Sequence, residues 1–208
     1  MIQTYQKQLK EAVIYGFFDM QNRNKIKTSE GWQWLSVPVI HRFTQKIFEV
    51  EINNTVQWGR KHLNALVTHY SKAPFFKDHI DFFEQTYAQD WKYLADINVH
   101  IVKHLAEALG LTDKKFVLAS ELETREGSTE RLIDICQQVG ADIYLSGKDG
   151  AKYMELELFK QEGIQVAFQD YEHPRYDQLY GDFELFLSII DLLFNCGPDS
   201  LSILKKGE

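Results

Sequence analysis

"DIYLSGKDGAKYMELELFKQEGIQVAFQD", residues 142–170, is the stretch that decides the fold. Its first five residues form an apolar strand pattern, Tyr153–Gln161 follows a helical pattern, and "IQVAFQD" is again apolar and β-branched. Short polar connections join the three segments. A strand, a helix and a second strand in this order predict a βαβ unit with parallel strands and a right-handed crossover.

The preceding segment shows the same alternation. "KFVLAS" (Lys115–Ser120) predicts a short strand, and Ser128–Val139 predicts a helix that Ser128 would cap. Near the other end, "FLSIIDLLFNCG" (Phe186–Gly197) predicts an apolar helix that ends at its glycine. We therefore expect an α/β fold: a parallel-sheet βαβ core with an inserted or appended helical layer.

In the first half of the chain, the predicted strands and helices do not alternate. Strand patterns cover Glu11–Phe18, Trp32–Ile40 and Lys46–Ile52. From Asn53 onward apolar residues recur at steps of three and four, which predicts a helix, a second helix after Pro74, and a third over Asp90–Leu109. We expect a mainly helical part at about residues 55–110 and, because no linker interrupts the chain, one domain over residues 1–208.

Composition places the chain among globular proteins. It has 208 residues, 44% of them hydrophobic, and a formal net charge of −7, which disfavours nonspecific binding to nucleic acid. Its two cysteines, Cys136 and Cys196, lie in apolar helical patterns and do not indicate a disulfide framework. Neither a membrane span nor a signal peptide is visible, so we expect a cytoplasmic protein.

Polar and small residues follow three of the predicted strands, at Ser120-Glu121, Ser146-Gly147 and Gln169-Asp170. Parallel strands end at one edge of a sheet, where ligands bind near the N-termini of the helices. There, Gly147 and Gly150 would let the backbone approach an anionic ligand, and Lys152 could supply charge. An ordinary turn explains "SGKDG" equally well, since these residue types are common in turns.

Two further polar segments are candidates for a binding or catalytic role. "NRNKIK" (Asn22–Lys27) places amide and cationic donors together, which suits phosphate, carboxylate or sugar hydroxyls, although an exposed hairpin connection would look similar. The loop at Gln169–Phe183 contains Asp170, His173 and Tyr176, and His173 could act as a general base. A surface loop packed by its own aromatic residues is the alternative.

The remaining histidines give weaker signals. His100 and His104 are four residues apart on one predicted helix, as metal ligands often are, but the glutamate of an H-E-x-x-H motif is absent. We therefore assign no metal. His62 follows the basic pair Arg60-Lys61 and could approach a ligand, and no cofactor is identified from the sequence.

Several segments resemble the WbqC-like family of bacterial proteins: "NRNKIKTSEGWQWLSVPV", "WGRKHLNALVTHYSKAPFF", "LASELETREGSTERLIDIC", "GADIYLSGKDGAKYM" and "YEHPRYDQLYGDFELFLSIIDLLFNCGPDSL". The resemblance runs from Asn22 to Leu204. It implies a cytoplasmic protein encoded among genes for O-antigen and other surface polysaccharides, for which a glycine-transferase role has been suggested. The polar residues that match the family pattern are Asn22, Arg23, Asn24, Lys27, Lys61, His62, Ser146, Gly147, Tyr153, His173, Tyr176 and Asp191.

Donors clustered at predicted strand ends, together with the setting that the resemblance implies, lead to one hypothesis, an enzyme: a transferase that moves glycine or another small acyl group onto a nucleotide- or lipid-linked sugar. Ser146, Gly147 and Lys152 would position a phosphate, Arg23 and Lys27 would hold a second anionic group, and His173 with Asp170 would be catalytic. The other substrate-binding candidates are Asn22, Asn24, Lys61, His62, Tyr153 and Tyr176.

The chain also departs from the family pattern. Family members begin with a strand and a loop containing His-Gln-Pro, whereas residues 1–21 here contain no histidine and no proline. The alternative function is therefore a noncatalytic ligand-binding or assembly protein of the same pathway. Its partners would be a small-molecule or sugar-linked substrate and enzymes of that pathway, and the sequence does not define an oligomeric state.

Overall fold

The computed structural model describes residues 22–42 and 45–207, and these form two compact units. The first unit contains residues 22–112 and 173–207, and the second contains residues 113–172. The strand predicted at Glu11–Phe18 lies outside the described residues. That the whole chain forms one domain stays a prediction. Among the described residues, no helix is both long and apolar enough to cross a membrane.

The described part of the first unit begins with a β-hairpin. β1 (Arg23–Thr28) pairs antiparallel with β2 (Gly31–Ser36), with Arg23 opposite Ser36 and Lys27 opposite Trp32. The donors of residues 22–27 are not in a hairpin connection, the alternative given for them above, because Arg23–Thr28 forms the strand β1. The turn lies at residues 29–30, and Gly31 directly after it takes a φ of 117° that favours glycine.

A second, shorter pair follows. β3 (Val39–Ile40) pairs antiparallel with β4 (Glu51–Ile52). The strand predicted over residues 46–52 is wrong for most of its length, because residues 47–49 form a 3₁₀ turn. The backbone N–H of Lys46 donates to Glu49 Oε2 at 2.9 Å, and this local bond competes with strand pairing.

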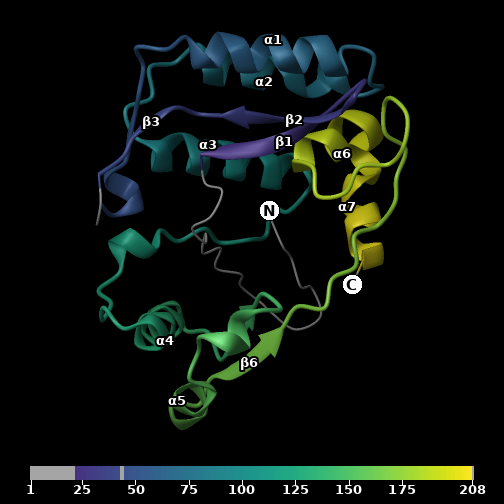
Figure 1. Ribbon diagram of the computed structural model, residues 1–208. Coiled ribbons are helices and arrows are strands. Elements are labelled where there is room, and N and C mark those ends of the chain that lie inside the picture. The colour runs from purple at the N-terminus through teal and green to yellow at the C-terminus, as the bar shows by residue number, and fades with distance from the viewer. Residues whose placement is uncertain (1–21, 43–44, 208) are drawn as a thin grey trace. The chain divides into compact units, whose positions relative to one another are not determined.

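The predicted helices of this unit are confirmed as α1 (Trp58–Tyr70), α2 (Phe76–Tyr87), α3 (Leu94–Ala108) and α6 (Ile189–Cys196), followed by the short α7 (Ser200–Leu204). In Figure 1, α1 and α2 run side by side along the hairpin, and α6 lies at its end. One core cluster contains Val50, Ile52, Trp58, Leu94 and Ile97, and a second group of rings packs around Phe194.

The close approach of α1 and α2 depends on Gly59. A Cβ atom at this position would lie 2.6 Å from the carbonyl oxygen of Tyr87, so the two helices would have to separate. We expect Gly59→Ala to lower the free energy of unfolding by about 1–2 kcal/mol, since overpacking outweighs the gain in helix propensity. Urea denaturation measures this, with Gly147→Ala as a control because nothing lies within 4 Å of its added Cβ. A Gly59→Ala protein of unchanged stability would contradict the packing seen here.

The second unit contains the predicted βαβ arrangement. α4 (Ser128–Val139) precedes β5 (Ile143–Ser146), α5 (Leu156–Gln161) and β6 (Gln165–Phe168), and β5 and β6 are parallel. Figure 1 shows α5 beside β6. The core of this unit consists of Leu132, Ile133, Cys136, Met154, Phe159 and Ile164. The mixed α/β prediction is thus confirmed, although the parallel sheet has two strands in the described part of the chain.

Two boundaries in this unit differ from the sequence prediction. Residues 115–118, expected as a strand, are irregular and lead into a 3₁₀ turn at residues 119–121, so Ser120-Glu121 does not end a strand. The helix expected from Tyr153 begins at Leu156, because the backbone N–H of Glu155 donates to Thr129 Oγ1 at 3.1 Å instead.

Candidate functional site

Four polar side chains from separate parts of the first unit meet in its interior. Tyr70 Oη donates to Asp191 Oδ1 at 2.8 Å, and Tyr176 Oη donates to Asp191 Oδ2 at 2.9 Å. The backbone N–H of Lys27 donates to Tyr70 Oη at 2.8 Å. We call Lys27, Tyr70, Tyr176 and Asp191 the Asp191 cluster. Both carboxylate oxygens of its acid accept a hydrogen bond from a tyrosine.

The cluster includes a buried cation. Lys27 is 2% exposed, and its Nζ donates to the backbone carbonyl of Asp182. Its charge acts on Asp191, which is 0% exposed. A buried lysine or carboxylate is costly unless it is paired and hydrogen-bonded, and here each has a partner.

Local sequence explains how these groups meet. Tyr70 is the last residue of α1 and continues its buried stripe, while Asp191 lies in the first turn of α6 within the apolar run "SIIDLLF". The backbone N–H of Ser188 donates to the carbonyl of Lys25 at 2.8 Å. This bond fastens the start of α6 to the edge of β1, and it thereby brings Asp191 next to the strand that carries Lys27.

Burial shifts the acid–base properties of the cluster. It raises the pKa of Asp191 above the ordinary range of a carboxyl, against the hydrogen bonds of Tyr70 and Tyr176 and the charge of Lys27, which act in the opposite direction. The pKa values of both tyrosines are raised by burial first and by the Asp191 charge second. The tyrosines therefore stay neutral donors, and Asp191 takes up a proton more readily than an exposed aspartate.

Residues 173–187 cover the cluster. Their side chains pack on one another: the ring of Tyr176 lies 5.3 Å from that of Phe183, and the ring of His173 lies 6.2 Å from Tyr176. Tyr180 Oη donates to the carbonyl of His69 at 3.0 Å, which ties the segment to α1. The segment has no helix or strand, so side-chain contacts fix its course.

The predicted residues divide between the two units. Those in the first unit are Asn22, Arg23, Asn24, Lys27, Lys61, His62, His173 and Tyr176. The Asp191 cluster brings together Lys27 and Tyr176. His62 is buried, its Nε2 donates to the carbonyl of Ser36 at 3.0 Å, and burial lowers its pKa. His62 therefore ties α1 to β2, while Arg23, Asn24 and Lys61 are exposed.

His173 lies beside the cluster within the covering segment. Its Nδ1 bonds to the carbonyl of Pro174 at 2.8 Å. A carbonyl only accepts hydrogen bonds, so Nδ1 carries the proton, and in the neutral ring Nε2 is the nitrogen able to accept one.

The predicted residues of the second unit lie around the turn after β5. Ser146 is buried and its hydroxyl donates to the carbonyl of Gly147 at 3.1 Å. Lys152 forms an ion pair of 2.5 Å with Asp149, which lowers the pKa of that carboxyl. A Cβ at Gly150 would overlap Ser146 Oγ, so this glycine is required for the compactness of the turn. Gly147, Tyr153 and Asp170 are exposed.

The ends of β5 and β6 meet as predicted. Ser146 pairs with Phe168, and the backbone N–H of Gln169 donates to the carbonyl of Ser146 at 2.9 Å. Polar residues therefore do follow both strands at one edge. The groups of this turn mainly bond to one another.

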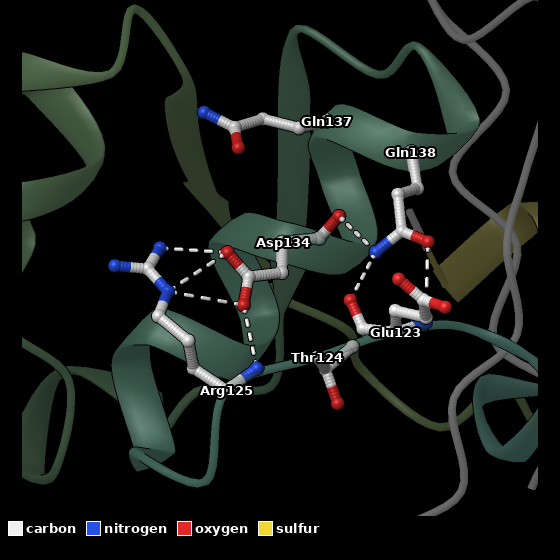
Figure 2. A pocket seen from close by; sticks show the side chains of 6 residues that line it. All are labelled: Glu123, Thr124, Arg125, Asp134, Gln137 and Gln138. Carbon is white, nitrogen blue, oxygen red and sulfur yellow. Dashed lines mark hydrogen bonds and ion pairs between the residues drawn. The ribbon is translucent and has the colours of Figure 1, made fainter.

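A polar hollow of about 430 Å³ lies elsewhere in the second unit, between residues 123–125 and α4. Figure 2 shows the guanidinium of Arg125 and the carboxylate of Asp134 facing each other, with a shortest N···O distance of 2.6 Å. Gln138 Nε2 donates to the carbonyl of Glu123 at 2.6 Å. These bonds fasten the segment to the helix, and none of the predicted residues line the hollow.

The paired histidines of α3 pack on an aromatic ring. The ring of His104 stacks on Phe82 at a centroid distance of 3.5 Å, and that of His100 at 5.0 Å. His100 Nε2 also bonds to Thr86 Oγ1 at 3.1 Å. In the described part of the chain, no group of three histidine, cysteine or acidic side chains is placed to hold a metal ion.

His104 makes stability depend on pH. Burial lowers its pKa, neighbouring His79 and His100 add to this, and Glu107 opposes it; its Nε2 has no hydrogen-bond partner among the described residues. The folded protein therefore holds His104 in its neutral form. Its full stability is present above about pH 6.5, the pKa of histidine in the unfolded chain, and stability is lost as the pH falls below this value.

We expect His104→Phe to keep the stack on Phe82 and to remove part of this acid sensitivity. Urea midpoints measured between pH 7.5 and 5 would fall less for the variant than for the natural protein. The control is His41→Phe at an exposed histidine. Parallel curves for the natural protein and His104→Phe would contradict the assignment.

Sequence reasoning missed Tyr70 and Asp182 as site residues, and it took Asp191 from the family pattern alone. One signal was available for Asp191: a single acid inside an apolar helical run is buried, and buried acids need partners. One of those partners, Tyr70, lies 121 residues away in sequence, so its identity could not be read from the segment around Asp191.

The sequence was compared with protein families, with individual proteins and with solved structures. A profile of the WbqC-like protein family matches residues 9–203. An uncharacterized protein of Mycobacterium tuberculosis, Rv1507c, is 37% identical over 191 residues, which cover 90% of this chain and 82% of the relative. No solved structure matches the chain.

Proposed function

Because the chain belongs to the WbqC-like protein family, we propose that it is a transferase of surface-polysaccharide biosynthesis. It would move glycine or another small acyl group onto a sugar-linked substrate. The observation that carries this proposal is the Asp191 cluster, a buried carboxyl with a raised pKa, held between two tyrosines beside a lysine. Ionisable groups with shifted pKa values concentrate at functional sites.

The cluster has the groups that acyl transfer needs. A hydroxyl or amine of the sugar would attack the acyl carbonyl of an activated donor, and Asp191 would accept the proton that the nucleophile loses. The ammonium group of Lys27 would stabilise the negative charge on the carbonyl oxygen. The leaving group would depart with the electrons of its bond to the acyl carbon. Residues 173–187 would have to move aside to admit both substrates, since Asp191 and Tyr70 are buried.

The other predicted residues keep their proposed roles. His173, next to Tyr176, would be a second candidate base, and Ser146, Gly147 and Lys152 would contact a phosphate. Lys152→Gln tests the phosphate role, because it removes the charge and its ion pair with Asp149 without changing a buried group. Unchanged affinity for a nucleotide-sugar in this variant would exclude this phosphate role of Lys152.

The experiment is a transfer assay on the purified protein. Nucleotide-sugars are incubated with glycyl and acetyl thioesters and adenylates, and mass spectrometry detects an acylated sugar. We expect a product that the natural protein forms and that Asp191→Asn does not form at a comparable rate. Acylation at the same rate by both proteins would exclude Asp191 as the base, and no product from any donor would count against a transferase.

One observation favours the noncatalytic alternative. Both oxygens of Asp191 and the Nζ of Lys27 already have partners inside the protein, as in a purely structural network. A protein of this kind would bind the sugar-linked ligand without changing it. Binding of nucleotide-sugars without any transfer, in the presence of all donors, would support this alternative.

A further inference from the structure

One face of the hairpin β1–β2 carries only basic, tryptophan and serine side chains. Two residues that lie opposite each other in an antiparallel pair point to the same face of the sheet. Along each strand, every second residue points to that face as well. The register places Lys25 opposite Trp34 and Lys27 opposite Trp32, with Arg23 opposite Ser36 at the end. The other face holds Ile26, which is fully buried in the core.

The tryptophans of this face are accessible. Trp32 is 43% exposed, Trp34 is partly exposed, and their rings meet edge to face with centroids 5.6 Å apart. Water-exposed tryptophan is unfavourable for a protein that has no use for it, since the indole is the largest apolar side chain. Two of them side by side form a platform for a flat or cyclic ligand.

The cations are held over these rings. The guanidinium carbon of Arg23 lies 4.5 Å from the centroid of Trp34, and Lys25 Nζ lies 4.2 Å from the centroid of Trp32. Within residues 22–42 and 45–207, the ion pairs that form involve other residues, so no carboxylate balances these two charges. One acid, Glu184, lies near Gly31, at the opposite end of the hairpin from Arg23.

A ligand for this face needs a ring and an anion. The hydrophobic face of a pyranose ring packs on indole, its hydroxyls accept hydrogen bonds from amide and ammonium groups, and a phosphate binds arginine and lysine strongly. In a protein of net charge −7, a local unpaired pair of cations attracts a compact anion better than a long polyanion. This argument favours a sugar phosphate over a nucleic acid.

We infer that the face formed by Arg23, Lys25, Trp32 and Trp34 is a binding site for a sugar joined to phosphate. The sugar ring lies against Trp32 and Trp34, and the phosphate lies at Arg23 and Lys25. The biological role of this site rests on the proposed function. The binding itself does not, because it can be measured without any transfer reaction. Lys27 lies on the same face, opposite Trp32, and its backbone N–H donates to Tyr70 of the Asp191 cluster, so the ligand lies on the strand that joins this cluster.

Titration calorimetry with the full chain tests the site. The probes are UDP-N-acetylglucosamine, N-acetylglucosamine 1-phosphate, UDP and free N-acetylglucosamine. We expect the sugar phosphates to bind and the neutral sugar to bind at least about tenfold more weakly. Comparable affinity of UDP and UDP-N-acetylglucosamine, with no binding of the 1-phosphate, would mean that the nucleotide alone is recognised and would overturn the assignment of the sugar to this face.

The variants separate the ring from the anion. Trp32→Ala should weaken the sugar phosphates about tenfold or more, as the loss of one stacked ring does elsewhere. Lys25→Gln should weaken them and flatten the dependence of their affinity on salt. The matched controls are Phe48→Ala, an exposed aromatic residue, and Lys92→Gln, a lysine 4.8 Å from the ring of Tyr93. Equal affinities in Trp32→Ala and the natural protein would overturn the site.

Two further outcomes decide what kind of site this is. Tighter binding of a single-stranded oligonucleotide than of any sugar phosphate would overturn the inference in favour of nucleic acid. Binding that depends on Trp32 while no donor ever gives transfer would leave the site standing and remove the transferase. If Trp32→Ala transfers the acyl group as fast as the natural protein, the transferase stands and the binding site on this face is overturned.

Discussion

Asp191→Asn is expected to lower the transfer rate by about 10²-fold or more and the free energy of unfolding by about 3 kcal/mol. The amide cannot accept the proton of the nucleophile. It also offers one acceptor where the carboxylate offers two, so the hydroxyl of Tyr70 or Tyr176 must turn away from its present bond. The buried ammonium of Lys27 loses the charge that it faces. Both losses come from the same substitution, so stability and rate must be measured on the same samples.

Two comparisons separate the causes. Asp199→Asn removes a charge of the same kind from an exposed position near α7 and should change neither quantity. Tyr176→Phe removes one hydroxyl and should cost less stability than Tyr70→Phe, which also leaves the backbone N–H of Lys27 without its partner. Equal stability of Asp191→Asn and Asp199→Asn would mean that the cluster contributes nothing to the fold.

Phe194→Ala is expected to destabilise the first unit by about 3–5 kcal/mol, the usual cost of emptying a buried aromatic position. Phe194 is 0% exposed, and its ring lies 5.1 Å from that of Tyr70, 5.3 Å from Phe76 and 6.1 Å from Phe83. Residues of α1, α2 and α6 therefore all lose a contact at once. Urea denaturation followed by far-ultraviolet circular dichroism measures the change.

The control for this prediction is Phe186→Ala, at a phenylalanine that is 58% exposed in the covering segment. It should change stability by less than about 0.5 kcal/mol. Phe194→Leu, which keeps most of the volume, should fall between the two variants. A loss below about 1 kcal/mol for Phe194→Ala would show that the cavity collapses and that the three helices do not depend on this ring.

Periodicity predicted the elements that one segment specifies by itself. The helices from Trp58 to Ala108 and the unit from α4 to β6 follow from spacing, caps and breakers, and their existence is confirmed. The strand at residues 23–28 was missed because Arg23, Lys25 and Lys27 make one of its faces basic, a pattern common in exposed loops. Residues 115–118 look like a strand by composition, yet no neighbouring strand pairs with them in the described part of the chain.

The candidate site was harder to predict than the fold. Lys27 and Tyr176 were identified as polar candidates, but their meeting at Asp191 depends on packing between distant segments. The tryptophan–cation face follows from strand register, which appears only when β1 is recognised as a strand. His62 and Ser146, predicted as ligand contacts, each form an internal hydrogen bond, and their contact with a ligand stays a prediction.

The first unit is assembled from two stretches, residues 22–112 and 173–207, and this sets the order in which it can form during synthesis. When α1 and α2 leave the ribosome, Tyr70 and Phe83 still lack Phe194, and Lys27 still lacks Asp182. The second unit emerges in between, and its own contacts are complete by residue 172. Synthesis proceeds at about 5–20 residues per second, so the apolar faces of the earlier helices stay exposed for several seconds. A nascent chain stalled between residues 112 and 173 would therefore be a natural client for a ribosome-bound chaperone.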